Sequence, residues 1–167
     1  GFDSASEESQ FGNVMNDRAV RFHRHGFSFG WLGHDGNIYP RYEAIRDGFV
    51  STLDAIRDVT PGVGSPVQWN VAYVNRIPRG TVWSTSRDWS FFRLWQPNPL
   101  ARLKIESESF AGMWRFPLEA GRGTLTIELS HDPGHDASHV NESLWLRVSA
   151  RGPIQGDEGS LFDGLDF

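Results

Sequence analysis

The clearest hydrophobic pattern in the chain lies between residues 39 and 59, and its period is that of an α-helix. Seven charged residues lie at the other positions there, and Pro40 suits a helix start because its missing N–H would lack a partner anyway. Residues 60–62, Thr-Pro-Gly, end the pattern. The apolar residues recur at intervals of three and four: Tyr42, Ile45, Phe49, Leu53 and Ile56. This stripe predicts one long helix that packs against another layer.

Segments on both sides of this helix alternate between apolar and polar residues, which is the pattern of a β-strand with one buried face. Residues 20–31 alternate with a one-position shift at His25-Gly26, which we interpret as a bulge or break in one strand. Between residues 81 and 97, a short helix capped by Ser86 and a loop both stay open. The pattern also predicts a hairpin turn at 119–121 and strands at about 67–77, 102–109, 110–118, 122–130 and 144–148.

Together these elements predict an α+β fold: a curved antiparallel sheet of about six strands packed against one long helix. The expected order is β-α-β-(α)-β-β-β-β, with the uncertain short helix in brackets. Residues 1–16 are rich in Ser, Glu and Gly and are expected to form a flexible arm. Residues 17–151 are expected to form a single domain. Residues 152–167 are interpreted as an acidic tail or linker that begins a further C-terminal portion.

The net charge of −5 is unevenly distributed along the chain. Seven of the 21 acidic residues lie in residues 1–16 and 152–167, where no Lys or Arg occurs, which leaves 14 acids and all 16 bases in residues 17–151. The body of the chain therefore carries about +2, and the acidity belongs to its ends. All the basic residues except Lys104 are Arg, which binds phosphate, carboxylate and aromatic partners better than Lys does. A GC-rich bacterial genome would produce the same bias.

Composition excludes several kinds of protein. The chain has no cysteine, which rules out disulfides, thiolate metal sites and cysteine nucleophiles. No apolar run approaches the roughly 18 residues that a membrane-spanning helix needs, and no signal peptide is visible. We therefore expect a cytoplasmic protein without a membrane partner. The seven Trp, twelve Phe and three Tyr favour a large aromatic core, with an aromatic-lined pocket as the alternative.

One part of the chain is similar to known sequences. From Asp17 to Val59 it joins a strand that ends in Phe-Gly-Trp, a Tyr-Pro-x-Tyr helix start and a Phe-bearing helix, followed by VAYVNRIP at 71–78. This arrangement resembles a sporadically distributed family of uncharacterised prokaryotic proteins, over roughly residues 17–150. Its most specific part is the Tyr-x-Asn-Arg-Ile at 73–77. The resemblance implies a longer protein with a C-terminal helical portion, and it implies no established activity, cofactor or catalytic residue.

The candidate binding site lies at the end of the alternating strand 67–77 and consists of Tyr73, Asn75 and Arg76. Asn75 falls in register with the apolar residues, so it is expected to be buried, where an amide must find hydrogen-bond partners. Arg76 offers its donors on the opposite face. These residues could anchor a ligand between helix and sheet. Alternatively, Asn75 ties the strand end to the loop that follows.

No catalytic motif is present, and no metal or cofactor is expected. His131, His135 and His139 recur every four residues, but Pro133-Gly134 breaks the helix that such a zinc motif requires. A solvated loop between two strands is the interpretation we prefer. His23 and His25 lie on one face of a predicted strand and could act as ligands or as a base, although surface histidines are the commoner case.

The sequence leaves three functional hypotheses. The leading one is a non-enzymatic binding or interaction module of a larger bacterial protein, with a protein or a small molecule as partner. The second is a hydrolase or other small-molecule enzyme with a pocket between helix and sheet. The third is a single-stranded nucleic-acid binder, which the near-neutral body charge disfavours. That third hypothesis draws on arginines interleaved with tryptophans: Arg21, Arg24, Arg76, Arg79, Arg87 and Arg93 with Trp83, Trp89 and Trp95.

Overall fold

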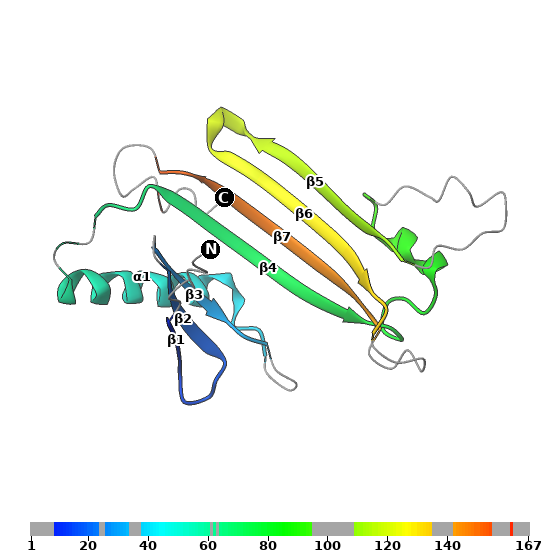
Figure 1. Cartoon of the computed structure of the whole chain (residues 1–167), viewed down its shortest axis with the longest axis horizontal. Helices are drawn as coiled ribbons and strands as arrows, with labels where there is room; N and C mark the ends of the chain where they lie inside the picture. Colours follow the sequence, from blue (N-terminus) through cyan, green and yellow to red (C-terminus); the bar gives the residue numbers. More distant parts are fainter. Residues whose placement is uncertain are drawn as a thin grey trace, which may run out of the picture. The chain divides into compact units, whose positions relative to one another are not determined.

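The computed structural model describes residues 9–23, 26–33, 38–60, 62, 64–94, 109–134, 142–154 and 161. The chain divides into two compact units, Gly1–Pro66 and Val67–Phe167. Seven strands and one α-helix lie in the described residues, which confirms the α+β class (Figure 1). The strands form two antiparallel sheets, of three and four strands, so the predicted single sheet of about six strands is not confirmed. That residues 17–151 fold as one domain stays a prediction.

The first unit holds the three-stranded sheet, in the order β1 (Ser9–Gly12), β2 (Arg18–His23) and β3 (Gly26–Trp31). The single strand predicted for 20–31 was wrong: His23 and Gly26 are register partners, so the chain reverses between them. The shift in the apolar pattern marks this reversal, because a hairpin and a bulge both interrupt alternation. Within residues 1–16, which were predicted to form a flexible arm, residues 9–12 form β1 and pair along their whole length with β2.

The helix α1 (Arg41–Val59) contacts the third strand of this sheet. Phe49 stacks on Phe27, with ring centroids 5.1 Å apart and planes 7° from parallel. Leu53 is buried, and the other four residues of the predicted stripe are half-buried. The predicted helix and its apolar side are therefore confirmed. The helix begins at Arg41 and not at Pro40, a difference of the size that helix ends usually show.

Gly48 is where the helix approaches this sheet closely. A Cβ built on Gly48 would lie 2.5 Å from Cζ of Phe29. We expect Gly48→Ala to destabilise the protein by about 1–2 kcal/mol, although Ala is favoured over Gly within a helix by about 1 kcal/mol. The measurement is urea unfolding. Ser51→Ala, at an exposed position of the same helix, is the matched control and should be neutral or slightly stabilising. Stabilisation by Gly48→Ala would show that Phe29 moves aside freely.

The second unit contains the four-stranded sheet, in the order β4 (Gln68–Pro78), β7 (Ser143–Pro153), β6 (Gly123–Asp132) and β5 (Ala111–Leu118). All neighbouring strands are antiparallel, and the long strands run side by side (Figure 1). The predicted hairpin turn at Glu119–Gly121 is confirmed as a 3-10 turn between β5 and β6. The strand predicted for 102–109 lies almost entirely outside the described residues.

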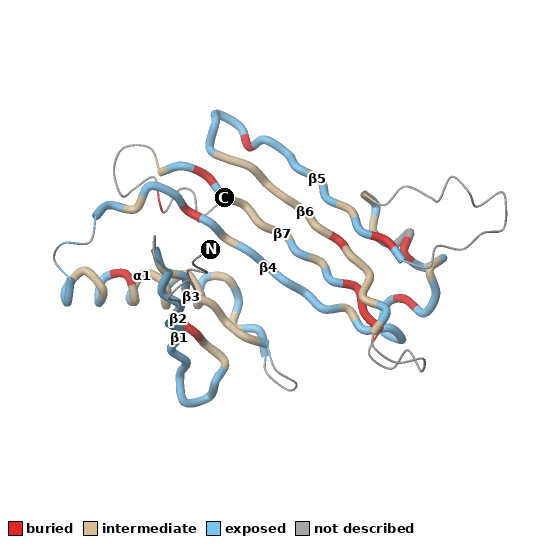
Figure 2. Tube along the Cα trace, in the orientation of Figure 1, coloured by how far each residue is buried: buried red, intermediate tan, exposed pale blue. Residues whose placement is uncertain are grey.

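The two faces of this sheet differ in chemistry, because side chains alternate along each strand and register partners share a face. The inner face is apolar apart from Asn75 and His131. Figure 2 shows that the buried positions gather toward the two ends of the strands, whereas the middle is half-buried or exposed. At the end where β4 finishes and β7 starts, the buried core consists of Trp83, Trp89, Phe110, Leu129 and Leu144.

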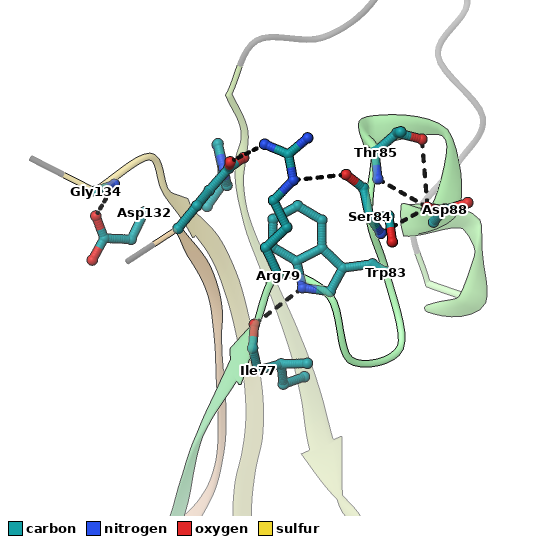
Figure 3. Close-up of polar contacts among 10 residues, drawn as sticks. Ile77, Arg79, Trp83, Ser84, Thr85, Asp88, Asp132 and Gly134 are labelled. Atoms are coloured by element: carbon teal, nitrogen blue, oxygen red, sulfur yellow. Dashed lines mark hydrogen bonds and ion pairs between the residues drawn. The ribbon is translucent and has the colours of Figure 1, made fainter. Parts of the chain in front are cut away.

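A short 3-10 helix, η1 (Ser86–Phe91), carries Trp89 into this core. The sequence predicted a possible helix here, with Ser86 as its cap, but the capping residue is Thr85. The Asp88 carboxylate accepts hydrogen bonds from the backbone N–H groups of Ser84 and Thr85, at 2.8 and 2.9 Å (Figure 3). These bonds stabilise the ionised form and lower the pKa of Asp88.

In the described part of the chain, no helix is both long enough and apolar enough to cross a membrane. The cytoplasmic location expected from the sequence stays a prediction.

Candidate functional site

The most concentrated polar chemistry of the described chain is a cluster of three side chains at the end of the four-stranded sheet. The Glu142 carboxylate, next to the start of β7, accepts a hydrogen bond from Arg79 Nη1 at 2.6 Å and contacts His131 Nε2 at 2.8 Å. The Arg79 side chain also donates through Nε to the Ser84 carbonyl at 2.8 Å (Figure 3). The cluster therefore ties together the ends of β4, β6 and β7 and the turn before η1.

Aromatic rings enclose the histidine of this cluster. The His131 ring lies 5.9 Å from Trp83, 5.1 Å from Trp89 and 6.5 Å from Phe110, centroid to centroid, and its side chain is 3% exposed. Because an ionised carboxylate only accepts hydrogen bonds, His131 Nε2 must carry the hydrogen that faces Glu142. Within the described residues, His131 Nδ1 and Trp89 Nε1 are buried without a hydrogen-bond partner. One buried water could bridge this acceptor and this donor.

The charge of Glu142 depends on its two partners. Burial by itself would raise the pKa of this carboxyl, since it disfavours the charged form. The hydrogen bonds from His131 and Arg79, together with the positive charge of Arg79, act in the opposite direction and lower the pKa below its ordinary value. Hydrogen bonds therefore stabilise the ionised form of Glu142, and they occupy both of its carboxylate oxygens.

This cluster suits a structural role. A general acid or base must reach within hydrogen-bonding distance of its substrate. The side chains of His131 and Glu142 are only 3% and 9% exposed, and each is already bonded to the other. The cluster was not predicted from the sequence, because its members lie in three separate segments and His131 was grouped with the loop histidines instead.

The predicted binding residues lie on β4, and the sheet separates them. Tyr73 and Asn75 are on the inner face, opposite Val148 and Leu146, whereas Arg76 is on the outer face opposite Trp145. Asn75 was expected to be buried and is exposed, so the need to satisfy a buried amide does not arise there. Whether Tyr73, Asn75 and Arg76 bind a ligand stays a prediction, but they do not form one surface.

The outer face of this sheet is open to solvent along all four strands. Every position on it is exposed or half-exposed, from the row of Arg76 to the row of Arg151. We define the outer face by its four rows of register partners: Arg76, Trp145, Ser130 and Ala111; Val74, Arg147, Glu128 and Met113; Ala72, Ser149, Thr126 and Arg115; Asn70, Arg151, Thr124 and Pro117.

Charge and apolar surface coexist on this outer face. Its four arginines are accompanied by one carboxylate, Glu128, which gives a net charge of +3. Arg147 Nε lies 3.7 Å from Glu128 in an exposed ion pair of little energetic weight. Three large apolar side chains are also exposed there: Trp145 at 39%, Met113 at 52% and Val74 at 57%. Asp132, just beyond the first row, accepts a hydrogen bond from the Trp145 indole N–H at 3.4 Å.

The arginines and tryptophans predicted from the sequence as a nucleic-acid surface share only Arg76 with the outer face. Trp83 and Trp89 from that set are 2% exposed and belong to the core, and Trp95 lies outside the described residues. Arg115, Arg147 and Arg151 were not in the set. The signal for them was present in β7, where Trp145, Arg147 and Arg151 alternate with apolar residues. Alternation does not reveal which of the two faces of the four-stranded sheet is covered and which is exposed.

The histidines do not form a metal site within the described residues, where no group of three or more His, Asp and Glu side chains is placed to hold an ion. His131 bonds to Glu142, and His23 is exposed. His25, His135 and His139 lie outside the described residues, so the metal-free interpretation of the loop stays a prediction.

The described geometry thus offers one buried polar cluster and one open, arginine-bearing sheet face. The resemblance to a prokaryotic family, drawn from residues 17–150, stays a prediction. A scan against protein-family models, a search of curated proteins and a search of solved structures each found no match to this chain.

Proposed function

We propose that this chain is a non-enzymatic binding module of a larger bacterial protein and that it contacts a polyanionic partner through the outer face. The observation that carries the proposal is the set of four arginines on one exposed sheet face that holds a single carboxylate. The whole chain has a net charge of −5, so this positive face is a local departure from the charge of the molecule. Such a patch attracts anions and steers their approach.

The choice of arginine supports a partner with phosphate, sulfate or carboxylate groups. Its planar guanidinium forms paired hydrogen bonds with these anions, and it remains charged at any physiological pH. Within the described residues Arg115 and Arg151 form no ion pair, and the contact of Arg147 with Glu128 is long. These side chains can therefore turn to an incoming anion at little cost.

The buried cluster supports a role in binding over a role in catalysis. The groups best suited to acid–base chemistry, His131 and Glu142, are bonded to each other inside the protein. This leaves the outer face as the surface on which a partner would act.

Heparin, a flexible sulfated polymer, is the first test of this proposal. A protein with a net charge of −5 should be repelled from it, so retention on a heparin column at low salt would report a local positive patch. We expect retention of the wild-type chain and clearly earlier elution of each of the single variants Arg147→Gln and Arg151→Gln. Arg93→Gln, which removes an exposed charge outside the outer face, is the control and should elute close to wild type. Flow-through of the wild-type chain, or equal shifts for the three arginines, would contradict the proposal.

A further inference from the structure

We infer that the polyanion is a single-stranded nucleic acid and that a base of it stacks on Trp145. This inference rests on the proposed binding function and names the partner of the same outer face. Its basis is the arrangement around Trp145, the one aromatic side chain among the outer-face residues. At 39% exposure this indole offers an apolar surface on a face where the other large exposed side chains are mainly charged.

Cations flank the indole on two sides. Arg76 is its register partner on β4, about 5 Å away across the sheet, and Arg147 is two residues further along β7, about 7 Å away. The Trp145 N–H is bonded to Asp132, which directs that edge of the indole toward the strand end. An aromatic platform with guanidinium groups beside it matches a nucleotide, whose base is an aromatic ring and whose phosphate is a neighbouring anion.

The face is long enough for more than one nucleotide. From Trp145 to Arg151, β7 spans about 20 Å, and Arg147 and Arg151 both lie on this line. Arg115 extends the positive surface toward β5. An extended strand could therefore lie along β7 with one base on Trp145 and its phosphates near successive arginines. Met113 and Val74 add apolar surface next to Arg147 in the second row.

The modest charge of the face favours a single strand over a duplex. Affinity for duplex nucleic acid comes largely from the counterions released when many phosphates are neutralised, and a net charge of +3 supplies few such contacts. In a duplex the bases stack on each other and cannot reach Trp145. A single strand exposes its bases, and each base–aromatic stack adds affinity that does not depend on charge. An acidic protein segment would meet the same arginines but would have no use for the indole platform.

Fluorescence anisotropy with a labelled oligothymidine of about twelve nucleotides tests this inference on the full chain. We expect saturable binding in low salt and at least tenfold weaker binding to a duplex of the same length. Trp145→Thr, which keeps a residue suited to a strand, should weaken single-strand binding roughly tenfold, whereas Trp145→Phe should restore most of it. Arg147→Gln should weaken binding and reduce the slope of log K against log salt by about 0.7.

Several results would overturn the inference. Equal affinity for single strand and duplex would show that charge alone is recognised, and an unchanged affinity of Trp145→Thr would show that no base stacks there. Melting curves of each variant establish that the fold is intact before binding is compared. Retention on heparin that depends on Arg147 and Arg151, without oligothymidine binding, would refute the nucleic-acid partner while leaving the polyanion-binding function in place. Loss of both would refute both.

Discussion

Gly152→Ala is expected to destabilise the four-stranded sheet by at least about 3 kcal/mol, the largest effect we anticipate for a single methyl group in this chain. Gly152 is buried in β7, where a Cβ would overlap the backbone carbonyl of Arg122 and lie 2.9 Å from Trp69 Nε1. Gly123, where β6 begins, is equally restricted from the other side of the same strand contact. Its φ is +143°, and a Cβ there would overlap the carbonyl of Arg151. Backbone atoms cannot swing aside as a side chain can, so the strands would have to separate.

The measurement for Gly152→Ala is the free energy of unfolding from urea titration. Gly26→Ala is the matched control, because Gly26 also lies in a strand but a Cβ built there meets nothing within 4 Å. We expect the control to be neutral or slightly stabilising, since Ala restricts the unfolded chain more than Gly does. A loss below about 1 kcal/mol for Gly152→Ala would mean that β6 and β7 tolerate a wider spacing at this end.

The two glycines illustrate what the sequence could not reveal. Alternation located β4, β5 and β6 well, because side-chain polarity repeats with period two wherever one face is covered. It found only the first part of β7, which continues to Pro153, inside the segment predicted as a tail. The close approach of Gly123 and Gly152 depends on which strands are neighbours. Strand order is a long-range property, and here β7 inserts between β4 and β6 although it comes last in the chain.

The division into two sheets was also hidden in the sequence for a physical reason. A shift of one residue in an alternating pattern arises from a bulge or from a reversal of the chain, and His25-Gly26 fits both. The short strand β1 carries Gln10 and Gly12 beside a single large apolar residue, Phe11, so its composition indicates an arm. Pairing with β2 overrides this local preference, as tertiary contacts commonly do for strands.

The candidate site also has a part that the sequence could predict and a part that it could not. Alternation alone could place Arg76, Trp145 and Arg147 on known sides of their strands, and the register then brings them together. The buried cluster could not be anticipated, because Arg79, His131 and Glu142 meet only when three strand ends converge. Polar residues are common in loops next to strand ends. The residues of this cluster differ from such loop residues only in that the side chains of His131 and Glu142 are buried, and burial is not visible in the sequence.

Glu142→Ala is expected to be the second most damaging substitution, at about 3 kcal/mol at neutral pH. Removing the carboxylate leaves the enclosed His131 without a bond at either ring nitrogen and takes from Arg79 its closest anion. The loss lies toward the low end of the range for buried pairs, because the Arg79 side chain is 38% exposed and water can replace part of the interaction. Glu128→Ala is the matched control: its ion pair with Arg147 is long and exposed, so the expected loss is under about 1 kcal/mol.

The effect of Glu142 should also depend on pH, with a predictable sign. Its pKa in the folded protein is lowered, so on acidification the unfolded chain takes up the proton first and the folded state loses this part of its stability. The stabilisation is complete above the ordinary pKa near 4.5 and disappears as the pH falls through the lower, folded-state pKa. We therefore expect the difference in unfolding free energy between wild type and Glu142→Gln to be constant from pH 7 to about pH 5 and to shrink below that. A difference that stays constant down to pH 3 would show that the ionised carboxylate contributes nothing through His131 and Arg79.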